Sequence, residues 1–190
     1  DNLGHLKQIK HYFKNTKSGF FFRDGLWLAL PGKKDEMEKS DIESLKKINF
    51  SKLKIGENYE LNFKNRAKFL GFGWSHNFGN KGVWSEGDLS FILFDLKKQK
   101  KSDYKMTLNF KPYHENKNKN FDLEIFLNGN QKKVINLYQN KNDMSASFNI
   151  KSDEIDSENI LTFKFNNLVS PLELFKSPDA RKLGILLKFI

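Results

Sequence analysis

Apolar and polar residues alternate along most of the chain after residue 59, which is the pattern of β-strands with one buried face. In segment 104–110 every second side chain is apolar. Segment 89–96 is apolar on both faces, which favours a central strand of a sheet. The pattern predicts about nine short strands, in segments 59–65, 67–74, 89–96, 104–110, the two halves of 121–139, 144–150, 159–165 and 184–190.

Turn residues mark several connections between these segments. Asn128-Gly129 lies between two alternating runs, which is the strongest short signal for a β-hairpin. Asp24-Gly25 lies between two apolar runs in the same way and predicts a β-ribbon. Pro112 is expected to end the strand before it. The two Ser-Pro pairs in segment 170–184 predict a loop with one helical turn.

The N-terminal part of the chain follows a different pattern. Apolar residues recur every three or four positions in residues 1–18, which predicts an amphipathic helix. Ser40 with Glu43 three residues later predicts a short capped helix over 40–47. We therefore expect an N-terminal helical or linker segment, 1–49, which could be the tail of a preceding domain, and a β-domain over 50–190.

The predicted fold class is all-β: an antiparallel, jelly-roll-like β-sandwich with a short helical N-terminal segment. A parallel α/β fold is disfavoured because no helices of about 10–15 residues separate the predicted strands. The 190 residues are 38% hydrophobic, which suffices for one sizeable core. No stretch of about 20 apolar residues is present, so no membrane-spanning helix is predicted. Because the chain begins at Asp1 without a methionine, we expect it to be a fragment of a larger protein or a processed one.

The net charge of +10 favours acidic partners such as phosphorylated glycans, and is compatible with peripheral contact to an anionic membrane. The lysines are nevertheless spread along the chain among aspartates and glutamates. Arginine, the preferred residue for bidentate phosphate recognition, occurs only at Arg23, Arg66 and Arg181. Specific nucleic-acid binding is therefore not predicted.

Motifs of known catalytic or metal chemistry are absent from the sequence. No cysteine is present, which excludes disulfides and thiolate metal sites. The four histidines, His5, His11, His76 and His114, do not have metal-ligand spacing. No nucleophile-elbow, P-loop or dinucleotide-binding motif occurs. We therefore predict no cofactor, no metal and no catalytic residue, although paired carboxylates that meet only in the fold stay open.

The segment GWSHNFGNKGVWSEGD, residues 73–88, differs from the rest of the chain. It carries two Trp-Ser pairs, at 74–75 and 84–85, among four glycines. The glycines and polar residues predict a loop with close backbone approaches. The tryptophans have two interpretations: core residues that hold the two sheets together, or platforms on which the apolar face of a sugar ring stacks.

Three segments resemble, in the same order, a β-sandwich module found at the C-terminal side of bacterial cell-envelope sugar and glycerol-phosphate transferases and beside some glycosyltransferases. The first is segment 70–96 with both Trp-Ser pairs, and the second is the hairpin 121–137. The third is the closing segment SPLELFKSPDARKLGILLKFI, 170–190. Its matching residues are Ser170, Pro171, Glu173, Leu174, Ser177, Asp179, Arg181, Leu183 and Gly184. The acidic residue usual between the Trp-Ser pairs is replaced here by HNFGNK.

This resemblance, which covers roughly residues 50–190, implies a non-catalytic, carbohydrate-binding-like accessory module of an enzyme that assembles a bacterial surface glycan, such as a capsule or lipo-oligosaccharide. It implies a glycan or glycan-phosphate as ligand, a parent transferase domain in the same chain, and a location at the cell envelope, on the cytoplasmic face or in the periplasm. Arg181 is expected to pair with Asp179 or Glu86. The candidate carbohydrate-binding residues are Trp74, Ser75, His76, Asn77, Trp84, Ser85, Glu86 and Arg181.

Two alternatives stay open from the sequence. The module is purely structural or binds protein if both indoles are buried. It contributes to the active site of a glycan-modifying transferase if paired carboxylates or a His-Arg cluster meet in a pocket.

Overall fold

The computed structural model describes residues 18–23, 26–31, 51–61, 69–71, 73–75, 81–96, 103–113, 115–138 and 142–190. The chain divides into two compact units, Asp1–Phe50 and Ser51–Ile190. In the first unit, β1 (Ser18–Arg23) pairs antiparallel with β2 (Leu26–Pro31), which confirms the predicted β-ribbon. The helices predicted for 1–18 and 40–47 lie outside the described residues, apart from Ser18, which begins β1.

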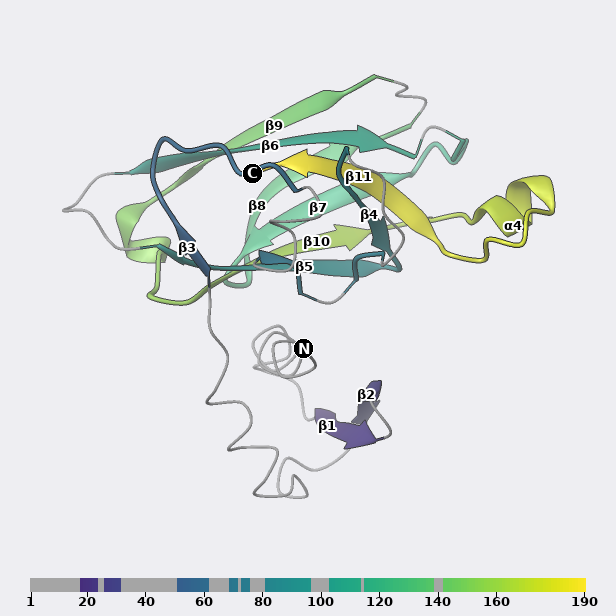
Figure 1. The fold of residues 1–190 in the computed structure, drawn as a ribbon, viewed down its shortest axis with the longest axis horizontal. Helices are drawn as coiled ribbons and strands as arrows, with labels where there is room; N and C mark the ends of the chain where they lie inside the picture. Colours follow the sequence, from purple (N-terminus) through teal and green to yellow (C-terminus); the bar gives the residue numbers. More distant parts are fainter. Residues whose placement is uncertain are drawn as a thin grey trace. The chain divides into compact units, whose positions relative to one another are not determined.

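The second unit is a sandwich of two sheets (Figure 1). One sheet has the order β3-β5-β10-β7-β8, with bounds Ser51–Leu53, Leu89–Leu96, Asn159–Phe165, Asp122–Leu127 and Asn130–Asn136. The other has the order β4-β11-β6-β9, with bounds Val83–Glu86, Leu183–Phe189, Tyr104–Pro112 and Met144–Ile150. Every pairing is antiparallel except that of β3 with β5. The predicted all-β sandwich is therefore confirmed.

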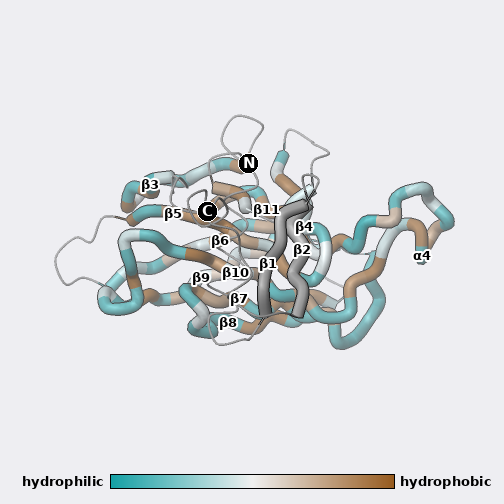
Figure 2. The backbone as a smooth tube through the Cα atoms, turned by 90° about the horizontal axis from the view of Figure 1, so that it is seen from below, coloured by the Kyte–Doolittle hydropathy of each residue, from teal (hydrophilic) through white to brown (hydrophobic). Residues whose placement is uncertain are grey.

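The core lies between the sheets and is built from alternate positions of their strands. In β7, Leu123, Ile125 and Leu127 are fully buried, whereas the residues between them are partly exposed. The same alternation of apolar and polar positions is visible along the strands of the sandwich in Figure 2. At the edge, the Lys133 amine of β8 donates to the Ser147 carbonyl of β9 at 2.9 Å, which links the two sheets.

Two connections follow directly from their turn residues. Asn128 (φ 50°) and Gly129 (φ 86°) both adopt the left-handed conformation between β7 and β8, as a two-residue hairpin turn requires. The helical turn predicted in the closing segment is α4, Pro171–Phe175. Ser170 caps it, and Ser170 and Glu173 form a reciprocal capping box.

The structure differs from the predicted strands at four places. Residues Val83–Glu86, in the segment predicted as a loop, form β4. Segment 67–74 was predicted to be a strand, but its described part, 69–71 and 73–74, forms only the isolated bridges of Leu70 with Ile92 and of Trp74 with Ser85. β3 was not predicted, because it has three residues and its partner β5 lies about 40 residues away along the chain. Segment 59–65 was predicted to be a strand, but its described part, 59–61, forms only an isolated bridge between Glu60 and Phe189. No helix in the described residues is long and apolar enough to cross a membrane.

Candidate functional site

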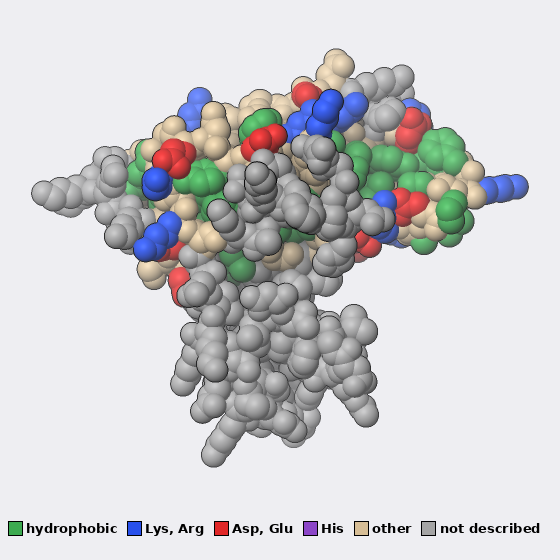
Figure 3. Space-filling model, in the orientation of Figure 1, with side chains coloured by type: hydrophobic (Ala, Val, Ile, Leu, Met, Phe, Trp, Pro, Cys, Tyr) green, Lys and Arg blue, Asp and Glu red, His purple; other side chains and the backbone are tan. Residues whose placement is uncertain are grey.

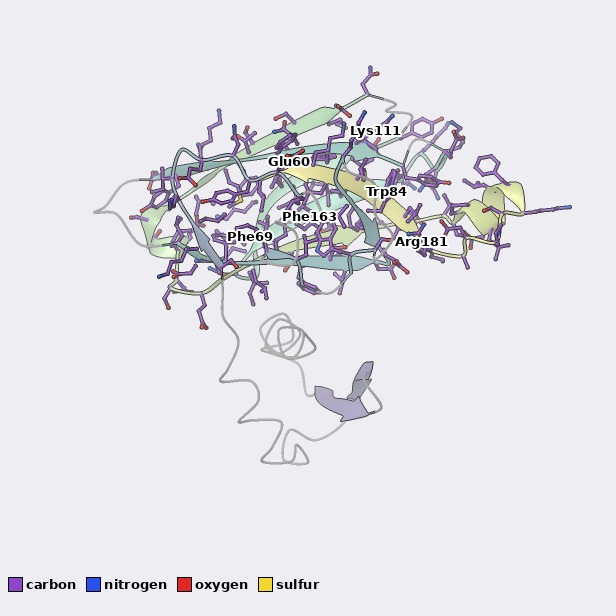
Figure 4. All side chains as sticks on the ribbon, viewed as in Figure 1. Glu60, Phe69, Trp84, Lys111, Phe163 and Arg181 are labelled. Carbon is purple, nitrogen blue, oxygen red and sulfur yellow. The ribbon has the colours of Figure 1, made fainter. Side chains whose placement is uncertain are left out.

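The pairing of β4 with β11 brings the Trp-Ser segment and the closing segment together. Leu183 lies opposite Glu86, and Leu186 lies opposite Trp84. The Gly87 backbone N–H also donates to the Lys182 carbonyl at 2.9 Å. This register places Arg181, two residues before Leu183, at the same end of the sandwich as Trp84 and Glu86 (Figure 4).

The two Trp-Ser pairs lie beside each other as antiparallel backbone. Trp74 forms a bridge with Ser85, and the Ser75 N–H donates to the Trp84 carbonyl at 2.8 Å. The Glu86 N–H donates to the Gly73 carbonyl at 2.7 Å. The repeated pair therefore forms a small ladder, which holds residues 73–75 against β4.

Glycine is required on both sides of this ladder. Gly73 has φ 85°, and a Cβ there would lie 1.9 Å from the Leu89 carbonyl oxygen. Gly82 has φ 125°, and a Cβ there would lie 2.5 Å from the Leu187 carbonyl oxygen. The predicted close backbone approaches are therefore confirmed at these two glycines.

Trp74 is a core residue. Its side chain is 7% exposed, its indole N–H donates to the Phe91 carbonyl at 2.7 Å, and its ring packs edge-on against Phe163 at 5.5 Å. The structure therefore favours the core interpretation of Trp74 over the sugar platform, because the large apolar ring and its one polar atom are both buried.

The two serines are also buried, and their hydroxyls serve the protein. The Ser85 side chain is fully buried and accepts a hydrogen bond from the Ile185 backbone N–H at 2.9 Å. The Ser75 hydroxyl, on a residue 3% exposed, accepts one from the Arg181 guanidinium. Their burial and hydrogen bonds favour a structural role over direct contact with a sugar. Ser75 instead positions Arg181.

Arg181 is the centre of the surface part of the site. Its Nε and Nη2 donate to the two carboxylate oxygens of Asp179, at 2.8 and 2.5 Å. The expected pairing with Asp179 is therefore confirmed. These hydrogen bonds from Arg181 lower the pKa of Asp179 and raise that of Arg181. The nearby Glu86 charge raises the pKa of Arg181 further.

An open depression of about 560 Å³ lies over this ion pair. It is lined by Glu86, Pro178, Asp179, Ala180 and Arg181. Two residues predicted for the site, His76 and Asn77, lie outside the described residues. Of the eight candidates, the structure thus brings Glu86 and Arg181 to the depression and keeps Trp84, which is half-buried, close to them.

Tyr113 and Asp179 belong to this site but were not among the candidates for sugar contact. Tyr113 follows the last residue of β6, and its ring packs perpendicular to that of Trp84 at 5.8 Å. Burial raises the pKa of the Tyr113 hydroxyl, and the charges of Glu115 and Asp179 raise it further. No local pattern marks Tyr113, because its partners are distant in sequence. We call Trp84, Glu86, Tyr113, Asp179 and Arg181 the Arg181 site.

Known proteins give little further guidance. No family model and no curated protein matches the chain. Among solved structures, a family 35 carbohydrate binding module from Clostridium thermocellum aligns with 70% of this chain and 97% of its own, at 7% identity and a TM-score of 0.38. A family 35 module from an environmental isolate aligns with 75% of this chain and 85% of its own, at 11% identity and a TM-score of 0.33.

A cycloisomaltooligosaccharide glucanotransferase from Paenibacillus aligns with 73% of this chain but only 18% of its own, at 8% identity and a TM-score of 0.38. At TM-scores below 0.5 none of these likenesses establishes a shared fold or function. The two-sheet architecture rests on the strand pairing of this chain, and its function has to be argued from the site.

Proposed function

We propose that the unit Ser51–Ile190 is a non-catalytic carbohydrate-binding module, and that it binds a saccharide at the Arg181 site. The main support for the proposal is the set of unused hydrogen-bond donors on the Arg181 guanidinium. Of its five N–H donors, three are used by Asp179 and Ser75. The other two, one on Nη1 and one on Nη2, have no partner among the described residues, and they lie at an open depression.

The chemistry of the surrounding groups suits a sugar. Sugar hydroxyls both donate and accept hydrogen bonds, so a saccharide site needs donors beside acceptors. Arg181 supplies N–H donors, and the carboxylates of Glu86 and Asp179 supply acceptors. No described residue donates a hydrogen bond to the Glu86 carboxylate. Charge-assisted hydrogen bonds of this kind are stronger than neutral ones, which compensates for the openness of the depression.

The site is held in place before a ligand arrives. Ser75 and Asp179 hold the guanidinium from two segments about 100 residues apart, and Tyr113 holds one side of the Trp84 ring. A donor fixed by its own hydrogen bonds loses little conformational entropy on binding. Preorganisation thus supports a binding role for residues that are also structural.

The wider role that we propose follows from the resemblance of the three ordered segments. The module would belong to an enzyme that assembles a bacterial surface glycan, such as a capsule or lipo-oligosaccharide. It would position the acceptor saccharide or stabilise a transferase domain in the same chain. Acidic and basic side chains are interspersed on the face of the described residues shown in Figure 3, which favours a glycan or glycan-phosphate over nucleic acid as partner.

A purely structural role is the second candidate, and the burial of Trp74 and Ser85 favours it. In this case Arg181 would only fasten the closing segment to the Trp-Ser ladder. The two roles differ in their response to changes that leave the fold intact. Glu86→Gln removes a charge at the depression, whereas Asp88→Asn removes one from an exposed residue two positions away.

A glycan array followed by calorimetry tests the proposal. We expect the wild type and Asp88→Asn to bind the same glycans with the same affinity. Glu86→Gln should weaken binding about tenfold, the effect of losing one charge-assisted hydrogen bond. Arg181→Lys, which keeps the charge but not the planar fork, should weaken it at least as much. Equal affinity in all four proteins, or no glycan bound by the wild type, would reject the Arg181 site.

A further inference from the structure

We propose that the module has a second saccharide-binding groove, at the opposite end of the sandwich from the Arg181 site, and that this groove takes a neutral sugar unit. The inference deepens the proposed function and rests on it, because it assumes that the ligand is a glycan. The groove has a volume of about 350 Å³, within the range of small-molecule sites. It lies between the loop that follows β3 and the first residues of β6. We call it the Tyr104 groove.

The walls and floor of the groove are apolar. Tyr59 and Tyr104, both half-buried, line it from two different segments. Its other apolar residues come from both sheets and from the C-terminus: Leu53, Leu96, Met106, Ile150 and Ile190. A tyrosine ring beside an apolar floor can cover the C–H face of a pyranose, as an aromatic side chain covers other apolar surfaces.

The Tyr59 wall is rigid. Its hydroxyl accepts a hydrogen bond from the Lys54 backbone N–H at 2.8 Å and donates one to the Glu57 carboxylate at 3.0 Å. Its ring packs edge-on against Phe69 at 5.1 Å, and its backbone exchanges two hydrogen bonds with Ile190. The groove is therefore preformed on this side, which lowers the entropic cost of binding.

The charges at the rim cancel. The Lys54 amine lies 3.2 Å from a Glu57 carboxylate oxygen, and the other two charged lining residues are Lys105 and Asp103. Asp103 also accepts a hydrogen bond from the Ser152 N–H at 3.3 Å. Among the described lining residues, two lysines and two carboxylates balance each other in a chain of net charge +10. An anionic ligand would find no excess of positive charge among these described side chains.

Both the floor and the rim restrict the ligand. An alkyl chain would pack against the apolar floor but would form no hydrogen bonds with the polar rim. A free phosphate would match neither the apolar floor nor the balanced charges of the rim. A neutral sugar ring has an apolar face and a polar edge, so it can satisfy both. The groove thus fits a neutral saccharide better than the charged glycan-phosphate that Arg181 could accept.

Strand β6 joins the two sites. Tyr104 begins β6 and lines the groove, and Tyr113 directly follows β6 in the Arg181 site. Nine strand steps of about 3.3 Å place the two ends about 30 Å apart. A single polymer that contacts both sites would bind more tightly than a short oligosaccharide, because the second contact is intramolecular.

NMR of methyl-labelled methionine tests the groove directly. Met106 lines it, and Met144, on β9, serves as an internal reference. The probes are cellohexaose, maltohexaose and chitohexaose at millimolar concentration. We expect at least one to shift the Met106 methyl resonance and not that of Met144. Tyr104→Ala should weaken this binding about tenfold or more. The matched change Tyr138→Ala, outside the groove, should leave it unaltered.

The outcomes separate the groove from the Arg181 site. If Met106 shifts in Glu86→Gln as in the wild type, the groove binds on its own. If the Trp84 indole responds to the probes and Met106 does not, the groove is rejected and the Arg181 site stands. If Met106 responds and the Trp84 indole responds neither to these probes nor to the glycan selected on the array, the Arg181 site fails and the groove stands. A Met106 shift that Tyr104→Ala leaves unchanged, or no response to any probe, overturns the groove.

Discussion

The two tryptophans of one short motif have different roles. Trp74 is buried in the core, whereas Trp84 is half-buried and packs against Tyr113 beside the Arg181 site. Both are followed by serine and have a glycine within two residues, so the local sequence does not distinguish them. The difference arises because the Trp74 ring packs against Phe163 of β10. This contact joins residues about 90 positions apart in the sequence.

Truncation of the two indoles should therefore have unequal effects on stability. Trp74→Ala should lower the free energy of unfolding by about 3–5 kcal/mol, the usual cost of removing a buried aromatic ring. Trp84→Ala should cost about 1–2 kcal/mol, because part of its surface is already in water. Urea unfolding of the two variants measures this difference. Equal costs would contradict the assignment of Trp74 to the core.

The glycines of the motif allow a second comparison at the residue scale. Gly73 and Gly87 both have positive φ, 85° and 82°, but only Gly73 lies against other backbone. Gly87→Ala should cost about 1 kcal/mol through its conformation alone. Gly73→Ala should cost about 3 kcal/mol or more, since its Cβ would also collide with Leu89. Equilibrium unfolding by urea gives both values, and similar costs would argue against the close approach at Gly73.

At the scale of the elements, local signals predicted the structure well wherever the chain reverses through a short turn. The β7–β8 hairpin followed from Asn128-Gly129, and the helical turn α4 followed from the Ser-Pro pairs. The strands β6, β9, β10 and β11 followed from alternation. The short parallel strand β3 could not be predicted, because a three-residue pairing with a distant strand leaves no periodic pattern.

The hairpin turn gives a prediction of its own. The Asn128 side-chain oxygen accepts from the Ile160 N–H at 2.9 Å, and its amide donates to the Glu154 carbonyl and the Asn159 side chain, each at 3.0 Å. Asn128→Gly should cost about 1–3 kcal/mol, because buried partners lose their hydrogen bonds. Asn128→Ala should cost about 1 kcal/mol more, since alanine disfavours φ 50°. Chemical denaturation of both variants checks the order.

Candidate site residues were harder to predict than elements. Arg181 and its pairing with Asp179 followed from the closing segment, because the two lie two residues apart. The burial of Ser75 and Ser85, and the place of Tyr113, depend on the registers of β4, β6 and β11. Where no short turn joins two strands, their register depends on how the whole sheet assembles, so a local sequence pattern does not reveal it.

At the scale of the whole molecule, several carboxylates among the described residues stabilise the fold in their charged form. Hydrogen bonds lower the pKa of Glu124, Glu154, Glu173 and Asp179, with donors from Lys164, Lys132, the Ser170 backbone and Arg181 as the respective main causes. A carboxyl with a lowered pKa in the folded state contributes stability above its unfolded pKa. That contribution is lost as the pH falls through the folded pKa.

The free energy of unfolding should therefore decrease below about pH 4, the pKa range of unfolded carboxyls. Glu124→Gln removes one of these groups, so the stability difference between it and the wild type should shrink as the pH falls from about 5 to about 3. Thermal or urea unfolding across this range checks both statements. A difference that grows on acidification would show that the charged form of Glu124 does not stabilise the fold.

The two ends of the sandwich carry the two proposed binding surfaces. The Arg181 site uses the pairing of β4 with β11, and the Tyr104 groove uses the other end of β6. The core residues Leu96 and Ile150 contribute to the floor of the Tyr104 groove, whereas Glu86 and Tyr104, the side chains chosen for substitution, are half-buried. Changes at the surface of either site should thus alter binding more than folding, which is what makes the binding experiments interpretable.

The most direct test of carbohydrate binding is an NMR titration that follows the indole N–H resonances of the tryptophans during addition of a glycan selected on the array. We predict that the Trp84 resonance shifts in a saturable manner, that the Trp74 resonance does not, and that Glu86→Gln weakens the response about tenfold. A Trp84 resonance that stays in place while the same glycan binds, or a response that Glu86→Gln leaves unchanged, would contradict binding at the Arg181 site.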